Sequence, residues 1–334
     1  MTGDSAPAAY VPPQRIGFKT LPPADLPLYR QVVAQALDHF GVRDYSIDGF
    51  LRHSNITARI TRPGRPGLAL RVRTGPTVSA RTELTWLLAV RAGTHVRTVA
   101  PYGTSLEEMT VEIPHPVEGG PLECSLFRWA EGEPLAAHLT PNSYHRLGAL
   151  AAEMHTFATS WTAPDGLAPL SWDRTMYYEG TRLVVARPEH SALVSRREAA
   201  IVEQVVAAAD VELARLAALP NPIFLHGNIE MWNVLVDQMG RLRLLDFEDV
   251  MRGQPIHDIA ITLYYGMERP DYQELAAAFR AGYTSVRDWP DVDEPVLRLL
   301  MAARATMLVN HTLLTEPDPR PVVARLLPII LRAG

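Results

Sequence analysis

Cysteine and lysine are almost absent from the 334-residue chain. Cys124 is the only cysteine, which excludes an intramolecular disulfide and argues against a cysteine-based metal site. Lys19 is the only lysine, so all other basic residues are arginines. A G-K-S or G-K-T phosphate loop is therefore excluded, and any site deeper in the chain that needs a cation must use an arginine.

Long hydrophobic runs and an excess of positive charge are also missing. No apolar stretch approaches the roughly 20 residues that span a bilayer, and the N-terminus lacks the charged-then-apolar pattern of a signal peptide. The formal net charge is −5, without the basic footprint that is typical of nucleic-acid binders. We therefore expect a cytoplasmic protein, a monomer or weak homodimer, that binds neither nucleic acid nor membrane.

The order of the expected elements indicates the fold class. Alternating runs at 56–61 and 68–73 flank the turn R-P-G-R-P-G and predict an antiparallel hairpin. Further strands are expected at 96–103, 109–114, 123–129 and 223–225, with a second hairpin over 234–246. Helices are expected at 26–41 and 80–93, after Thr140-Pro141, from the Ser195–Glu198 capping box, and at 271–282, 294–315 and 319–333. Strands followed by helices, without a G-x-G-x-x-G after a strand, predict an α+β protein with two lobes.

A change from strand-rich to helix-rich sequence sets the expected domain boundaries. The short Ala/Pro-rich start predicts a loose arm at 1–14. The expected divisions after it are an N-lobe at 15–127, a hinge at 128–135 and a C-lobe at 136–334.

Three segments of the second half carry polar residues at a spacing suited to chemistry. They read H-G-N-I-E-M-W-N (226–233), L-L-D-F-E-D (244–249) and H-D-I-A (257–260). Asn233 and Asp246 flank the expected 234–246 hairpin, whose return brings them close together. An amide oxygen and a carboxylate are hard ligands of the kind that Mg²⁺ prefers. The pair could therefore share one magnesium ion in a phosphoryl-transfer site, although both residue types are also common in turns.

These segments resemble the catalytic segment of the aminoglycoside phosphotransferase and choline kinase family, small-molecule phosphotransferases with a protein-kinase-like fold. The family pattern reads H-G-D-x-x-x-x-N, then I-D-F-E/D, then D-L-A. The resemblance implies that Asn233 and Asp246 bind Mg²⁺, that Asp258 braces the catalytic loop, and that His226 belongs to that brace in the catalytic site. The sequence departs from the family at Asn228, where the catalytic aspartate is expected.

The same resemblance assigns nucleotide binding to the N-lobe. The run L-A-L-R (68–71) is similar to the family strand that carries a phosphate-binding basic residue, so Arg71 takes this role and Glu83 is its partner. Residues 49–55 are expected to form a loop that covers the phosphates, with Ser54 and Asn55 in contact. The expected hinge contacts to the base of ATP or GTP are Phe127, Arg128 and Trp129. The implied architecture is a small, mostly antiparallel β N-lobe with one helix and a larger helical C-lobe.

The implied activity is magnesium-dependent transfer of a phosphoryl group from ATP or GTP to a hydroxyl group. The substrate class is a small molecule, either an antibiotic or a natural-product or metabolite alcohol. Aromatic and acidic residues of the C-lobe are the candidate substrate contacts: Glu230, Trp172, Tyr177, Tyr178, Glu268 and Asp271. The aromatic residues could equally be core, and the acidic ones solvated helix starts. Glu248 and Asp249 could be further metal ligands or surface charges.

Position 228 leaves three interpretations open. An asparagine can orient a hydroxyl but cannot accept its proton at neutral pH. Asn228 could be an engineered substitution that traps substrate, a natural variant that still turns over, or a feature of a non-catalytic binding relative. The family pattern alone predicts that Asn228→Asp raises phosphotransferase activity by about 10²–10⁴-fold.

Overall fold

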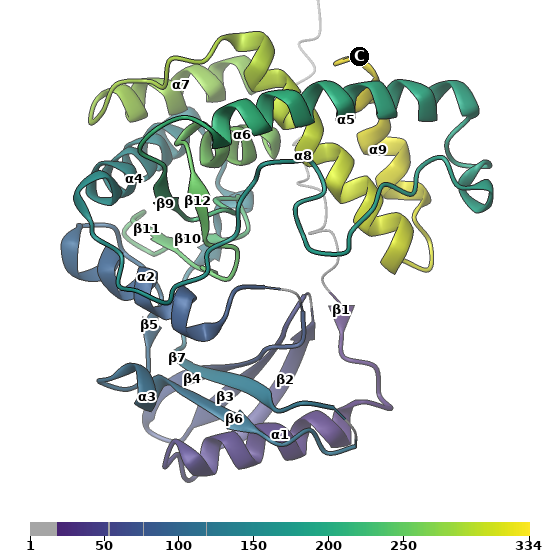
Figure 1. The fold of residues 1–334 in the computed structure, drawn as a ribbon. Coiled ribbons are helices and arrows are strands. Elements are labelled where there is room, and N and C mark those ends of the chain that lie inside the picture. The colour runs from purple at the N-terminus through teal and green to yellow at the C-terminus, as the bar shows by residue number, and fades with distance from the viewer. Residues whose placement is uncertain (1–18, 53, 76, 118) are drawn as a thin grey trace, which may run out of the picture.

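The computed structural model describes residues 19–52, 54–75, 77–117 and 119–334. The predicted N-terminal arm at 1–14 lies outside these residues. The described chain forms two lobes: one is built around a sheet, and the other is mainly helical (Figure 1). This is the α+β class predicted from the sequence.

The N-lobe sheet is antiparallel, with the strand order β1-β2-β3-β4-β7-β5, and β6 also pairs with β7. Alternation along β4 buries Leu68, Leu70 and Val72 on one face and turns Arg71 to the other. The predicted hairpin is present, with Leu70 opposite Ala58. The strands are β1 (Lys19–Thr20), β2 (Ser46–Arg52), β3 (Ile56–Arg62), β4 (Arg65–Val72), β5 (Ala100–Pro101), β6 (Thr110–Ile113) and β7 (Leu122–Arg128).

Two longer helices flank this sheet on opposite sides. Helix α1 (Leu26–His39) packs on the outer side and buries Val32, Val33 and Leu37 against the N-lobe core (Figure 1). Helix α2 (Ala80–Gly93) starts at Ser79, whose side chain accepts a hydrogen bond from the backbone N–H of Thr82. The apolar face of α2 joins the large hydrophobic cluster of the C-lobe. Helix α2 therefore lies between the two lobes.

The C-lobe consists of helices packed around short strands. Its helices are α4 (Pro141–Ser160), α5 (Arg196–Ala217), α6 (Ile256–Tyr264), α7 (Tyr272–Thr284), α8 (Glu294–Thr315) and α9 (Arg320–Leu331). Capping boxes start α4 at Thr140 and α5 at Ser195, as the sequence predicts. Helices α4 and α7 approach closely at Gly148, where an added Cβ would lie 2.0 Å from the carbonyl oxygen of Phe279. Only glycine fits such a crossing.

The short strands flank the motif segments 226–233 and 244–249, and the third segment, 257–260, lies in α6. The predicted hairpin is formed by β10 (Val234–Val236) and β11 (Leu242–Leu244), and β8 (Glu133–Pro134) pairs with β10. β9 (Ile223–Leu225) pairs with β12 (Met251–Gly253). Residues 226–233 therefore connect β9, which pairs with β12, to β10, which pairs with β11.

Some sequence expectations require correction. Residues 49–52 are not a loop, because they continue β2 and pair with β3 through a β-bulge near Gly49. The expected strand at 96–103 is reduced to β5, and a short helix, α3 (Leu106–Met109), precedes β6. Helix α6 was not among the expected elements; its nine residues are all buried, and so short a buried segment cannot be distinguished from a buried strand by its sequence pattern. Within the described residues, no helix is both long and apolar enough to cross a membrane.

Candidate active site

A cavity of about 370 Å³ lies between the two lobes. Sheet residues of the N-lobe, the chain between the lobes and the β10–β11 hairpin all contribute to its wall. The lining residues are Leu51, Asn55, Thr57, Ala69, Arg71, Val99, Phe127, Arg128, Trp129, Ala130, Gly132, Pro134, Asn233, Leu235, Leu245, Asp246 and Glu248. Predicted nucleotide and metal residues from distant parts of the sequence therefore meet in one cavity.

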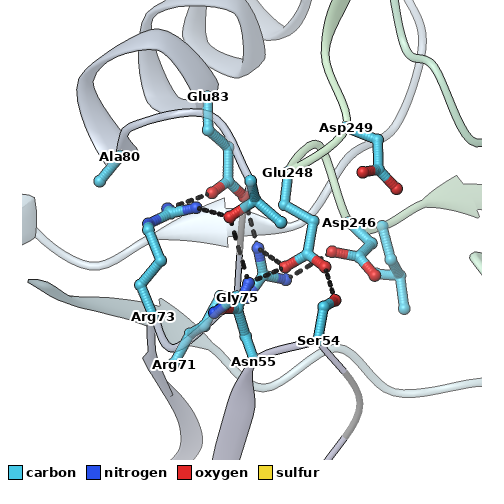
Figure 2. A network of polar contacts seen from close by, with 12 residues as sticks. Ser54, Asn55, Arg71, Arg73, Gly75, Ala80, Glu83, Asp246, Glu248 and Asp249 are labelled. Atoms are coloured by element: carbon cyan, nitrogen blue, oxygen red, sulfur yellow. Dashed lines mark hydrogen bonds and ion pairs between the residues drawn. The ribbon is translucent and has the colours of Figure 1, made fainter. Parts of the chain in front are cut away.

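Arg71 lines this cavity and contacts three carboxylates (Figure 2). Its guanidinium donates to Glu83 at 2.7 Å and to Asp246 at 2.9 Å, and lies 3.5 Å from Glu248. Burial alone would lower the Arg71 pKa, but the negative charges of Glu83, Asp246 and Glu248 raise it overall. The expected pairing of Arg71 with Glu83 is present, and Arg71 is a permanent cation at this position.

Arg73, which directly follows β4, is a second arginine that was not predicted to belong to this site. Arg73 donates to the other oxygen of Glu83 at 2.6 Å and lies 2.9 Å from Glu123. Glu83 is 1% exposed, so one buried carboxylate binds two guanidinium groups. The alternation of Arg71 and Arg73 along one strand face was the available sequence signal.

Ser54 and Asn55 connect the β2–β3 turn to the C-lobe. The Ser54 hydroxyl donates to Glu248 at 2.7 Å, and the Asn55 amide donates to Glu248 at 2.5 Å. The Asn55 oxygen accepts from the backbone N–H groups of Thr74 and Gly75. Burial and the nearby Asp246 charge raise the Glu248 pKa to about 7. Glu248 is therefore a buried inter-lobe contact rather than a surface charge.

The β10–β11 hairpin brings Asn233 and Asp246 to the same cavity. Its register places Val234 opposite Leu244. Asn233 and Asp246 therefore lie just outside the paired segment, at the same end of the hairpin. Asp246 has φ +64°, a left-handed backbone conformation that is uncommon outside glycine and is often found at functional sites. Within the described chain, no cluster of three or more His, Cys, Asp or Glu residues could hold a metal by itself. One carboxylate and one amide fit Mg²⁺, which usually combines few protein ligands with water and substrate phosphates.

Asp258 holds the backbone of the loop at 226–233, the expected catalytic loop. Its carboxylate accepts from the N–H groups of His226 at 3.0 Å and Gly227 at 2.8 Å, and from His155 at 3.1 Å. Burial would raise the Asp258 pKa, but these hydrogen bonds and the neighbouring histidines lower it. His226 donates from Nε2 to the carbonyl of Leu245 at 2.9 Å, which connects the loop to the Asp246 segment. Burial lowers the His226 pKa and favours its neutral form.

Asn228 lies in a buried polar cluster on the C-lobe side. Its amide nitrogen donates to Asp249 at 3.0 Å, and its amide oxygen accepts from Arg304 at 2.9 Å. Arg304 also donates to Tyr177 at 3.3 Å and to Tyr265 at 3.2 Å, and Tyr178 donates to Asp249 at 2.5 Å. Arg304 was not predicted. The available signal was its position as the only charged residue in the helical run 299–315.

The remaining predicted residues divide into two groups. Phe127, Arg128 and Trp129 line the cavity, but the backbone N–H of Trp129 donates to Gly67 within the N-lobe. Glu230 is buried and hydrogen-bonds Tyr265 near the Asn228 cluster. The structure assigns core or ion-pair positions to others: Trp172 is buried in the C-lobe core, Glu268 lies 3.4 Å from Arg325, and Asp271 pairs with Arg269 at 2.7 Å.

The model of the phosphotransferase enzyme family matches residues 51–295, which include the cavity, the hairpin and the catalytic loop. The chain belongs to the phosphotransferase enzyme family. Its fold is the kinase-like α+β fold of small-molecule phosphotransferases. No curated protein matches the chain significantly.

Solved structures of other phosphotransferases share this fold at low sequence identity. A microcompartment-associated aminopropanol kinase aligns with TM-score 0.70 and 20% identity over 91% of this chain and 95% of its own. An amicoumacin kinase, solved in complex with AMP-PNP, Ca²⁺ and Ami, aligns with TM-score 0.70 and 17% identity over 91% of this chain and 93% of its own. A choline kinase from Streptococcus pneumoniae aligns with TM-score 0.59 and 14% identity over 91% and 98%. At these identities the comparison establishes the fold alone.

Proposed function

We propose that this phosphotransferase family member transfers the γ-phosphoryl group of ATP or GTP to a hydroxyl of a small molecule. The observation that carries the proposal is the meeting of Arg71, Asn233 and Asp246 in one inter-lobe cavity. A guanidinium and two side chains with oxygen ligands in one cleft match the phosphate and metal groups of a magnesium nucleotide. The apolar walls formed by Ala69 and Leu235 suit a planar base.

The proposed roles follow from these contacts. Asn233 and Asp246 hold Mg²⁺, which when bound neutralises charge on the transferring phosphates. Arg71, held by Glu83, contacts the phosphates, and Asp258 keeps the catalytic loop in place through the N–H groups of residues 226 and 227. Because the transition state of phosphoryl transfer is loose, much of the catalysis comes from such positioning.

The substrate alcohol is proposed to bind to the C-lobe. Tyr177, Tyr178 and Glu230 surround the catalytic-loop cluster, whereas the N-lobe side of the cavity is formed by Arg71 and the strands. Hydrogen exchange should show substrate protection in the C-lobe segments 160–190 and 264–311. Protection confined to 45–75 would contradict this location.

The test is a phosphorylation screen read by mass spectrometry. Aminopropanol, spectinomycin, choline and a panel of hydroxylated metabolites are incubated with Mg²⁺ and ATP or GTP, and a gain of one phosphoryl group is sought. Asp246→Ala is the matched inactive control. A product that forms with the native chain and not with the control supports the proposal, whereas no product across the panel favours the alternative of a nucleotide- or ligand-binding relative.

The alternative rests on Asn228, because an amide cannot take the proton that an aspartate would accept. A non-catalytic relative would bind Mg²⁺ and AMP-PNP without transfer. The screen and a binding measurement on the same preparation therefore separate the two functions.

A further inference from the structure

Asn228 is held by two neighbours of opposite chemistry. A guanidinium can only donate hydrogen bonds and an ionised carboxylate can only accept them. Arg304 therefore faces the amide oxygen, and Asp249 faces the amide nitrogen, at 2.9 and 3.0 Å. All three residues are at most 7% exposed. An amide satisfies both neighbours at once, whereas an aspartate at position 228 would place a second carboxylate against Asp249.

The backbone brings Asp249 to this position through a close contact with Gly227. Gly227 has φ +81°, and an added Cβ would lie 1.9 Å from the carbonyl oxygen of Asp249. The 246–249 segment is thereby packed against the catalytic loop. Figure 2 shows the Asp246, Glu248 and Asp249 side chains extending from this one segment. One carboxylate of the segment faces the proposed metal, and another faces residue 228.

The neighbouring carboxylates are engaged in other contacts. Asp246 pairs with Arg71, Glu248 accepts from Ser54 and Asn55, and Asp258 accepts from the backbone of the catalytic loop. Asp249 is the carboxylate that lies one hydrogen bond from the side chain of residue 228. It also accepts from the Tyr178 hydroxyl at 2.5 Å.

We propose that Asp249 is the proton acceptor of the reaction, and that Asn228 and Arg304 are positioning residues that orient it. The inference rests on the proposed phosphotransferase function. The substrate hydroxyl oxygen forms a bond to the γ-phosphorus, and the bond from that phosphorus to the β–γ bridging oxygen breaks. The electron pair of the broken bond leaves with the nucleoside diphosphate. The hydroxyl proton passes to the Asp249 carboxylate and then to solvent.

This arrangement changes the expectation for position 228. The family pattern alone predicts a large gain from Asn228→Asp. If Asp249 already accepts the proton, the native chain is competent, and Asn228→Asp should lower the transfer rate rather than raise it, because it removes the amide that donates to Asp249 and places a second carboxylate beside it. The exchange variant Asn228→Asp/Asp249→Asn keeps one amide and one carboxylate in the pair. It should therefore remain active, whereas Asp249→Asn alone should lose about 10²–10⁴-fold.

The experiment measures single-turnover loss of the γ-phosphoryl group from labelled Mg·ATP, with water or aminopropanol as acceptor. Asp249→Asn and Asp249→Ala should each lower the single-turnover rate by about 10²–10⁴-fold. Calorimetry should show that both variants bind AMP-PNP with unchanged affinity. Formate should restore part of the rate to Asp249→Ala, because it supplies a carboxylate in the space left by the side chain. Asp318→Asn, an exposed carboxylate between α8 and α9, is the matched control and should leave the rate unchanged. Thermal melting confirms that each variant is folded.

Four outcomes overturn the inference. The first is an Asp249→Asn rate within threefold of the native rate, and the second is a gain of 10²-fold or more in Asn228→Asp. The third is a folded, inactive Asp249→Ala variant that formate does not rescue, which would indicate a merely structural carboxylate. The fourth is a native chain that binds AMP-PNP and transfers to neither acceptor nor to any compound of the screen, which overturns the proposed function as well. If the native chain transfers the phosphoryl group and substitution of Asp249 leaves the rate unchanged, only this inference is overturned and the proposed function stands.

Discussion

Replacing Glu83 by glutamine tests how much the buried ion pairs between β4 and α2 contribute to stability. Glu83 is 1% exposed and accepts from Arg71 at 2.7 Å and from Arg73 at 2.6 Å. Glutamine keeps the shape and one acceptor oxygen but removes the charge. Its amide group also places a donor against a guanidinium, which has no acceptor.

The magnitude follows from the contacts that remain. Breaking a buried pair by removing one charge typically costs about 3–5 kcal/mol, because the other charge stays buried. Here Asp246 still pairs with Arg71, and Glu123 with Arg73. We therefore expect Glu83→Gln to lower the free energy of unfolding by about 3 kcal/mol, the lower end of that range.

Glu123→Gln is the matched control, because Glu123 contacts the same Arg73 at 2.9 Å but is 30% exposed. Partly exposed ion pairs contribute at most about 1 kcal/mol. Urea unfolding followed by circular dichroism measures both variants. Equal losses in the two variants, or a loss below 1 kcal/mol for Glu83→Gln, would refute the argument that burial makes the Glu83 pairs important.

Three further predictions concern the metal, the loop and pH. Asp246→Ala should abolish the magnesium dependence of AMP-PNP binding with the fold intact, and calorimetry showing unchanged, magnesium-dependent affinity would exclude Asp246 as a ligand. Gly227→Ala should lower the free energy of unfolding by about 3 kcal/mol or more, because its Cβ would overlap the Asp249 carbonyl; urea midpoints within error of the native value would contradict this. Burial lowers the His257 pKa from 6.5 to about 4, so the unfolded chain takes up a proton first as pH falls, and stability is lost between about pH 6.5 and pH 4. His257→Gln should reduce this loss by roughly 3 kcal/mol, and identical pH dependence of native and variant unfolding would disprove the assignment.

Local physical chemistry made much of the fold readable from the sequence. The strand alternation at 56–73, the caps at Thr140 and Ser195 and the hairpin over 234–246 depend on neighbouring residues, and each element forms where its pattern predicts. Helix α6 shows the limit of such patterns. Its nine residues are all buried, and a short buried segment of this kind cannot be distinguished from a buried strand by its sequence pattern alone.

The predicted site residues show the same division. The spacing of Asn233 and Asp246 around one hairpin is a local property, and the two residues do line a common cavity. The pairing of Arg71 with Glu83 could be anticipated from the strand and helix that follow each other in the family pattern, and the structure contains it. The metal and phosphate roles of these residues stay predictions that the variants above will test.

The surroundings of Asn228 were decided by tertiary structure alone. Arg304 contacts Asn228 from 76 residues away along the chain, and Asp249 reaches it because Gly227 permits a close backbone approach. Sequence patterns record the residue at position 228 and its departure from the family, but they carry no information on which donor and which acceptor the folded chain places on either side of it. Those neighbours determine whether Asn228 simply lacks the function of a base or instead orients a different base, Asp249. Hydrogen bonding depends on interatomic distances, and only the packed lobes define these.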